Sequence, residues 1–235
     1  KPYLKLREET TARDRSLREK VMSLEEAASM VHDGDQVALG GCTMSRTPMA
    51  MIWALIRAGR KDLTVSRSIV STEGDLLYAS GASRHIMTSW FSQGIVWGIS
   101  KVMRHYTESH AAKFEEWSHM SMGLRYRAGA MGVPFIPTRS MLGSGVRDVI
   151  GEAVQDMICP FTGETLLLLP ALNPDVALIH VQRADEYGNA CHGCAAKVAS
   201  AGGCPSAAAG SGHEGPRSHS RARSEEHTSE LQSQI

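Results

Sequence analysis

Residues 36–48, QVALGGCTMSRTP, form in succession a predicted strand, a glycine turn and the start of a helix. Residues 37–39 suit a buried strand, Gly40 and Gly41 permit a sharp turn because they lack a Cβ atom, and Pro48 fits the first turn of a helix. Helix starts leave backbone N–H groups without partners, and these attract negative charge. We expect this loop to bind an anion or an oxyanion, although a glycine pair can also serve packing alone.

Strands and helices alternate on both sides of this loop. Ser23 and Glu26 form a capping box ahead of a helical pattern that continues to about residue 32. Residues 48–58 are almost all apolar, as in a helix buried on most sides, and Gly59 is placed to end it. A further helical stripe runs from Phe114 through Trp117 to Met131. Strands are expected at residues 63–65, 84–90, 133–137, 165–169 and 176–181.

The last two of these strands are continuous apolar runs, which is typical of parallel strands covered on both faces. With the alternation of elements, they predict an α/β fold with an open, mostly parallel sheet flanked by helices, in one domain. Residues 71–75, STEGD, are expected to form a polar turn where a parallel strand opens into a crevice. Glu73 is therefore a candidate catalytic carboxylate, although loops often carry solvated acids. Residues 142–145, LGSG, form a second glycine turn suited to close approach by a ligand.

Composition excludes several classes of function. The 235 residues contain 25 basic and 25 acidic side chains, so no global positive field recruits nucleic acid or anionic lipid. The longest apolar runs are shorter than the ~20 residues of a membrane helix. Residues 1–20 are charged throughout, which favours a solvated arm over a signal peptide. The odd count of five cysteines argues for reduced thiols, and we expect a cytoplasmic protein.

Three stretches in the same order resemble a known family. They are residues 33–41 (DGDQVALGG) with Pro48, residues 125–137 (RYRAGAMGVPFIP) with residues 142–144 (LGS), and residues 173–182 (NPDVALIHVQ) with residues 188–189 (GN). Together they resemble the α (A) subunit of family I coenzyme A transferases of the glutaconate CoA-transferase type, over residues 23–189. The resemblance implies the sheet architecture shared with NagB and RpiA. One departure is Cys42, where the family usually has phenylalanine.

The resemblance also implies a mechanism and partners. Family members are heteromers with the active site between two subunits and the nucleophilic glutamate on the β subunit, so no catalytic residue is expected in this chain. Coenzyme A is a substrate, no other cofactor is implied, and the partners are an acyl-CoA, a carboxylic acid and the β subunit. Backbone donors would bind coenzyme A or stabilise the oxyanion, and the candidates are Gly40, Gly41, Gly74, Gly143, Ser144 and Gly145.

Glu73 stands where related α subunits often carry a small residue, which lowers its chance of being a nucleophile.

Two alternatives to the transferase remain open. A hydrolase branch of the family, which opens rings of steroid-derived CoA esters, has a catalytic glutamate in the α subunit. His119 aligns nearest that position here, and Glu115 and Glu116 keep the hydrolase alternative open. The other alternative is a non-catalytic ligand-binding module, in which the glycine turns are structural.

After Asn189 the family pattern stops. Residues 191–235 are rich in Ala, Gly, Ser, Pro and His, and residues 223–233 resemble a translated sequencing adapter, so we expect a disordered, artefactual tail. Residues 21–190 then form an incomplete α-subunit domain after an arm at residues 1–20. Cys191 and Cys194 have the spacing of a zinc pair, with His192 and Cys204 nearby, but no second pair exists and no metal site is expected.

Overall fold

A six-stranded sheet with the strand order β11-β8-β1-β2-β3-β4 forms the centre of the fold. The computed structural model describes residues 3–14, 16–94, 96–191 and 232–234. Pairing is parallel throughout β8-β1-β2-β3-β4, whereas β11 is antiparallel to β8. The predicted open, mostly parallel sheet is thus confirmed. The strands are β1 (Gln36–Leu39), β2 (Leu63–Ser66), β3 (Ser83–Thr88), β4 (Lys113–Glu116), β8 (Val176–Ile179) and β11 (Gln232–Gln234).

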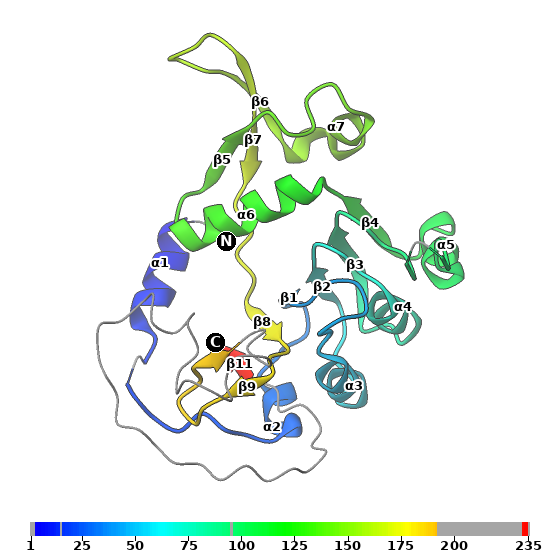
Figure 1. Ribbon diagram of the computed structural model, residues 1–235, viewed down its shortest axis with the longest axis vertical. Coiled ribbons are helices and arrows are strands. Elements are labelled where there is room, and N and C mark those ends of the chain that lie inside the picture. The colour runs from blue at the N-terminus through cyan, green and yellow to red at the C-terminus, as the bar shows by residue number, and fades with distance from the viewer. Residues whose placement is uncertain (1–2, 15, 95, 192–231, 235) are drawn as a thin grey trace, which may run out of the picture.

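Four helices pack against this sheet, one before β1 and three between its parallel strands (Figure 1). They are α2 (Leu24–Ser29), α3 (Met49–Arg57), α4 (Thr72–Ala79) and α5 (Lys101–Glu108). The capping box is confirmed, because the Ser23 side chain accepts from the N–H of Glu26 while the Glu26 carboxylate accepts from the N–H of Ser23 at 2.7 Å. Gly59, with a φ of 70°, follows the end of α3 as expected. Apolar side chains between helices and sheet form one core that includes Ile52, Leu77 and Ile86.

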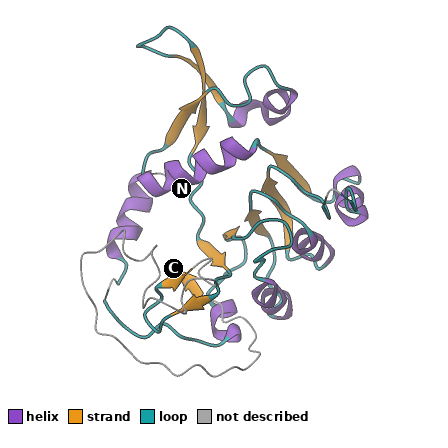
Figure 2. Ribbon diagram, viewed as in Figure 1, coloured by secondary structure: helices purple, strands orange, loops and turns teal. Residues whose placement is uncertain are grey.

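A second, smaller sheet lies across α6 (His119–Met131) from the first (Figure 2). Its strands are β5 (Phe135–Thr138), β6 (Gln155–Ile158) and β7 (Thr165–Pro170), which are antiparallel in the order β5-β7-β6. Before β6 come α7 (Gly145–Ile150) and a 3-10 turn at Gly151–Ala153. The core here joins Met87 of β3, Met122 of α6 and Leu167 of β7, so α6 connects the two sheets.

Three expectations from the sequence were wrong, one about the direction of strand pairing and two about the kind of secondary structure. Residues 165–169 belong to the small antiparallel sheet, where Leu167 and Leu169 are buried and their neighbours are partly exposed, because only one face is covered. Phe114 lies in strand β4 and not in the helix, which begins at His119. Residues 71–75 are not a turn, since α4 already begins at Thr72. The last two errors have one cause, because the apolar spacing of a short segment does not by itself distinguish helix, strand and turn.

The two ends of the chain add short elements. Residues 3–12 form helix α1 (Tyr3–Ala12), and β9 (Arg183–Ala184) pairs with β10 (Ala190–Cys191). The predicted tail and its zinc-like motif lie mostly outside the described residues. In that tail, Gln232–Gln234 form β11, which differs from the expected disorder for these three residues. In the part of the chain with described structure, no helix is long and apolar enough to cross a membrane.

Candidate functional site

The carboxyl edge of the parallel sheet holds the glycine loop. Strands β2, β3 and β4 follow β1 on one side, while β8 lies on its other side, so the strand order reverses at β1 and β8. Ligands in open α/β sheets bind in the crevice outside the strand ends at such a reversal. Gly40 continues the pairing beyond β1, because its N–H donates to the carbonyl of Leu178 at 2.8 Å.

The loop after Gly40 is a tight turn that only glycine permits at its start. Gly41 has a φ of 88°, and a Cβ atom on it would lie 2.5 Å from the carbonyl oxygen of Arg46. Cys42 and Ser45 exchange two backbone hydrogen bonds of 3.0 and 2.9 Å, which close the turn. The N–H of Gly41 donates no hydrogen bond to any described part of the chain.

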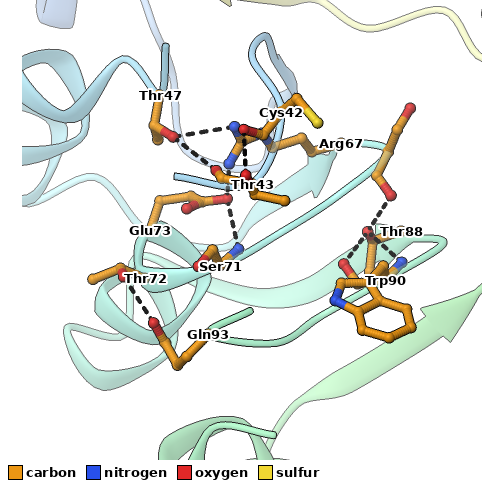
Figure 3. A network of polar contacts seen from close by, with 11 residues as sticks. Cys42, Thr43, Thr47, Arg67, Ser71, Thr72, Glu73, Thr88, Trp90 and Gln93 are labelled. Carbon is orange, nitrogen blue, oxygen red and sulfur yellow. Dashed lines mark hydrogen bonds and ion pairs between the residues drawn. The ribbon is translucent and has the colours of Figure 1, made fainter. Parts of the chain in front are cut away.

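A buried ion pair contacts the end of this loop through Thr47 (Figure 3). Arg67, directly after β2, and Glu73, in the first turn of α4, each have side chains that are 1% exposed and in contact through Nη1 and Oε1. Nη2 of Arg67 donates to Oγ1 of Thr47 at 3.1 Å. Oε1 of Glu73 also accepts from the N–H of Ser71 at 3.0 Å. The pair thus connects the end of the glycine loop to the start of α4.

Gly74, the predicted anion-binding neighbour of Glu73, has a packing role. Its N–H donates to the carbonyl of Ser71 at 3.0 Å. An added Cβ atom would lie 2.4 Å from Cγ1 of Val70 and 2.5 Å from Cζ of Phe91. Glycine is required here because α4 packs closely on those two side chains, and its N–H group is not free for a ligand.

A second polar group joins α4 to the segment after β3. The side chain of Gln93 accepts from Oγ1 of Thr72 at 2.9 Å and donates to Oδ2 of Asp75. Oδ1 of Asp75 accepts from Oγ of Ser100 at 2.5 Å. Burial raises the pKa of Asp75, against the opposing effect of these hydrogen bonds. Thr88, at the end of β3, donates to the carbonyls of Ser68 and Trp90. Side chains therefore hold both ends of the loop that follows β3.

Glu115, one of the two carboxylates kept for the hydrolase alternative, is fully engaged at the end of β4. It contacts Nε2 of His85 at 3.1 Å and Nζ of Lys113 at 3.0 Å, and it accepts from Nε1 of Trp117 at 2.8 Å. Burial opposes ionisation, but these donors outweigh it and lower the pKa of Glu115 to about 2. Glu115 is therefore a fixed carboxylate anion, whereas Glu116 is exposed to solvent.

Arg125 of α6 completes this cluster. Its guanidinium lies 3.8 Å above the centre of the Trp117 ring, and Nη1 is 3.9 Å from Oε1 of Glu115. Nε donates to the carbonyl of Pro170 at 3.1 Å, which ties α6 to the end of β7. Burial lowers the pKa of Arg125 to about 10, and the nearby carboxylate of Glu115 opposes that shift. Arg125 stays charged at neutral pH.

The second glycine turn lies elsewhere. Gly143 has a φ of 69°, and Ser144 uses both its N–H and its hydroxyl on the carbonyl of Met141, at 3.1 and 2.8 Å. Gly145 begins α7, which Figure 1 shows beyond β4 and away from the loop between β1 and α3. The structure thus brings Gly40, Gly41 and Gly74 to one edge, and it leaves residues 143–145 apart from them.

Sequence reasoning missed Arg67, Thr47 and Gln93. The available signal was Arg67, a charged residue directly after the strand at residues 63–66 and six positions before Glu73.

Within the described residues, no group of three His, Cys, Asp or Glu side chains is placed to hold a metal ion.

Comparisons with known proteins identify relatives of the chain. Residues 21–210 match the family model described as coenzyme A transferase. The chain is 37% identical to the A subunit of 3-oxoadipate CoA-transferase from Pseudomonas knackmussii, with 72% of this chain and 60% of the relative covered. It is 30% identical to the cholesterol ring-cleaving hydrolase IpdA subunit of Rhodococcus jostii, with 75% of this chain and 61% of that relative covered.

The fold is also similar to a solved structure. Glutaconate coenzyme A-transferase from Acidaminococcus fermentans superposes with a TM-score of 0.69 at 29% identity, over 74% of this chain and 60% of that chain. The chain thus spans less than two thirds of the length of each of these three proteins. The resemblance inferred from the three sequence motifs is confirmed.

Proposed function

The chain belongs to the coenzyme A transferase family, and on this premise we propose that it is the α subunit of a heteromeric CoA-transferase. The enzyme would move coenzyme A from an acyl-CoA thioester to a carboxylic acid. Coenzyme A is its substrate, and the β subunit is its partner. Two similar relatives are named as the A subunits of CoA-transferases, which supports this assignment.

The proposed reaction proceeds through a glutamate of the β subunit. Its carboxylate attacks the thioester carbonyl, the C–S bond breaks, and an acyl-glutamyl anhydride and the CoA thiolate result. The thiolate then attacks the glutamyl carbonyl, which releases the first carboxylic acid and leaves a glutamyl-CoA thioester. The acceptor carboxylate takes up CoA by the same two steps in reverse. Covalent catalysis of this kind divides one difficult step into easier ones.

The proposal rests on one observation: the carboxylates of Glu73 and Glu115, at the carboxyl edge of the parallel sheet, are both engaged by cations or hydrogen-bond donors. Glu73 is buried and ion-paired with Arg67, and Glu115 is surrounded by His85, Lys113 and Trp117. A carboxylate whose lone pairs are engaged by cations and N–H donors is a poor nucleophile, because the attack must first break those contacts. This supports a nucleophile on the partner subunit, with this chain supplying binding and backbone donors.

Gly41 is the donor that we assign to the reaction. Its N–H group is unused within the described chain and is fixed by the closed turn of residues 42–45. The tetrahedral intermediates carry an oxyanion, and one aligned donor at such a position is worth roughly 2.7–4 kcal/mol of transition-state stabilisation. Gly143 and Gly145 stay candidates for binding coenzyme A, at a separate place on the chain.

The hydrolase alternative is less well supported. A relative of 30% identity is named as a ring-cleaving hydrolase subunit. However, the carboxylate of Glu115 has its acceptor positions occupied, and Glu116 is exposed on strand β4. A carboxylate that activates water must be free to accept a proton, which Glu115 is not, so of these two residues only Glu116 is left for this alternative. Transfer and hydrolysis differ in whether product forms without a carboxylic acid acceptor.

The test is to map the covalent adduct after co-expression of the chain with its β subunit. When the complex is incubated with an acyl-CoA and no acceptor, mass spectrometry of peptides should find a CoA adduct on a glutamate of the β subunit. Transfer of coenzyme A should require the acceptor acid and both subunits. An adduct on Glu73 or Glu115, or robust transfer by the isolated chain, would contradict the proposal. Product formation without the acceptor would favour the hydrolase.

A further inference from the structure

The loop between β3 and α5 exposes large apolar side chains. Val96 is 85% exposed, Trp97 is 75% exposed and Ile99 is 56% exposed. Residues 93–99, QGIVWGI, contain no charged side chain. Large exposed apolar side chains on one short loop make that loop a candidate for contact with another protein.

This loop is held in place from both of its ends. The N–H of Gln93 donates to the carbonyl of Gly98 at 3.0 Å, and the N–H of Gly98 donates to the carbonyl of Gly94 at 3.0 Å, which closes the base of the loop. The carboxylate of Asp75 then accepts from Gln93 on one side and from Ser100 on the other. Hydrogen bonds therefore anchor the loop on both sides of Val96 and Trp97, and this anchoring lowers the ordering cost of binding a partner.

The loop is also continuous with the candidate site. Asp75, which holds the loop, lies two residues after Glu73 on α4, and Glu73 holds the glycine loop through Arg67. Figure 3 shows Gln93 beside Thr72, on the same helix start as Glu73. A partner seated on the loop would therefore lie next to the edge of the sheet that carries Gly41.

We propose that Val96, Trp97 and Ile99 form a docking surface for the β subunit of the heteromer. This inference rests on the proposed function. Tryptophan is enriched at the centres of protein interfaces, where it often carries much of the binding energy. The loop also places the partner at the edge where the proposed chemistry needs a glutamate from outside the chain.

The test compares three variants of the full chain for binding to the purified β subunit by isothermal calorimetry. Val96→Asp and Trp97→Asp should each raise the dissociation constant by about 30-fold or more, which is the loss of affinity expected at an interface hot spot. The control is Phe161→Asp, because Phe161 is 94% exposed in the turn between β6 and β7. It should bind within about twofold of wild type. Circular dichroism should give the same spectrum for all variants.

Each other result overturns the inference in a distinct way. If Trp97→Asp binds the β subunit with wild-type affinity, the docking surface is wrong while the proposed function stands. If the wild-type chain binds no β subunit, both are wrong. Hydroxyl-radical footprinting adds an independent measurement: Trp97 should be oxidised in the isolated chain and protected in the complex. Protection already in the isolated chain would overturn the inference, because a second copy or the chain itself would cover the loop.

Discussion

Arg67 and Glu73 form an ion pair in which each side chain is only 1% exposed. The two residues lie six positions apart, one after strand β2 and the other in the first turn of α4. Because Arg67 also donates to Thr47 at 3.1 Å, the pair connects three consecutive segments at the carboxyl edge of the sheet. The fold therefore uses the glutamate in the most suggestive sequence position, Glu73, to fix the glycine loop.

Removal of one partner from this pair should destabilise the chain strongly. Glu73→Ala leaves the Arg67 guanidinium buried without its counter-ion, and we expect the free energy of unfolding to fall by about 3–5 kcal/mol. The double variant Arg67→Met/Glu73→Leu should lose less than Glu73→Ala, since neither charge remains buried. Urea unfolding followed by circular dichroism measures both values.

The exposed pair Arg139–Glu164 is the control for that experiment. Its atoms are 3.2 Å apart, but the side chains are 71% and 52% exposed. Glu164→Ala should therefore change the free energy of unfolding by less than about 1 kcal/mol. A loss at Glu73 no larger than the loss at Glu164 would show that the buried pair does not stabilise the edge of the sheet.

Gly41→Ala should disrupt the glycine loop beyond the cost of its backbone angle. A left-handed conformation costs a residue with a Cβ atom about 1–3 kcal/mol. At Gly41 the new atom would also collide with the carbonyl of Arg46. Gly59→Ala is the matched control, because Gly59 has a φ of 70° but nothing within 4 Å of the new atom. Thermal unfolding should show a larger loss for Gly41→Ala, and equal losses would mean that the loop yields freely.

Stability should fall in acid because of Glu115. Its pKa is lowered from 4.5 to about 2 in the folded chain. As the pH falls below about 4.5, the unfolded chain takes up a proton that the folded chain refuses until about pH 2, so the folded state loses stability across that interval. The loss is on the order of 2 kcal/mol once screening by solvent is allowed for.

Urea unfolding of wild type and Glu115→Gln at pH 5, 4 and 3 measures this effect. The variant has no carboxylate at this position, so its free energy of unfolding should depend less steeply on pH. Parallel curves for the two proteins would assign the acid sensitivity to other groups.

Much of the fold was predictable because its signals are local. The strand at residues 37–39, the turn at Gly40 and Gly41 and the capping box at Ser23 each depend on residues within a few positions of one another, and each prediction is confirmed. The failures came where partners are distant in sequence. The run at residues 165–169 is apolar enough for a parallel strand, but its pairing with residues 135–138 and 155–158 is antiparallel.

The sequence by itself determined the alternation of strands and helices, the glycine loop and the family resemblance, since propensities, turns and motif order are written along the chain. Only the tertiary structure decided what the charged residues do. Glu73 is held by Arg67, and Glu115 by His85, Lys113 and Trp117. Whether a carboxylate is free or engaged depends on donors that folding brings to it and on the water that burial removes, and neither is set by its neighbours in sequence.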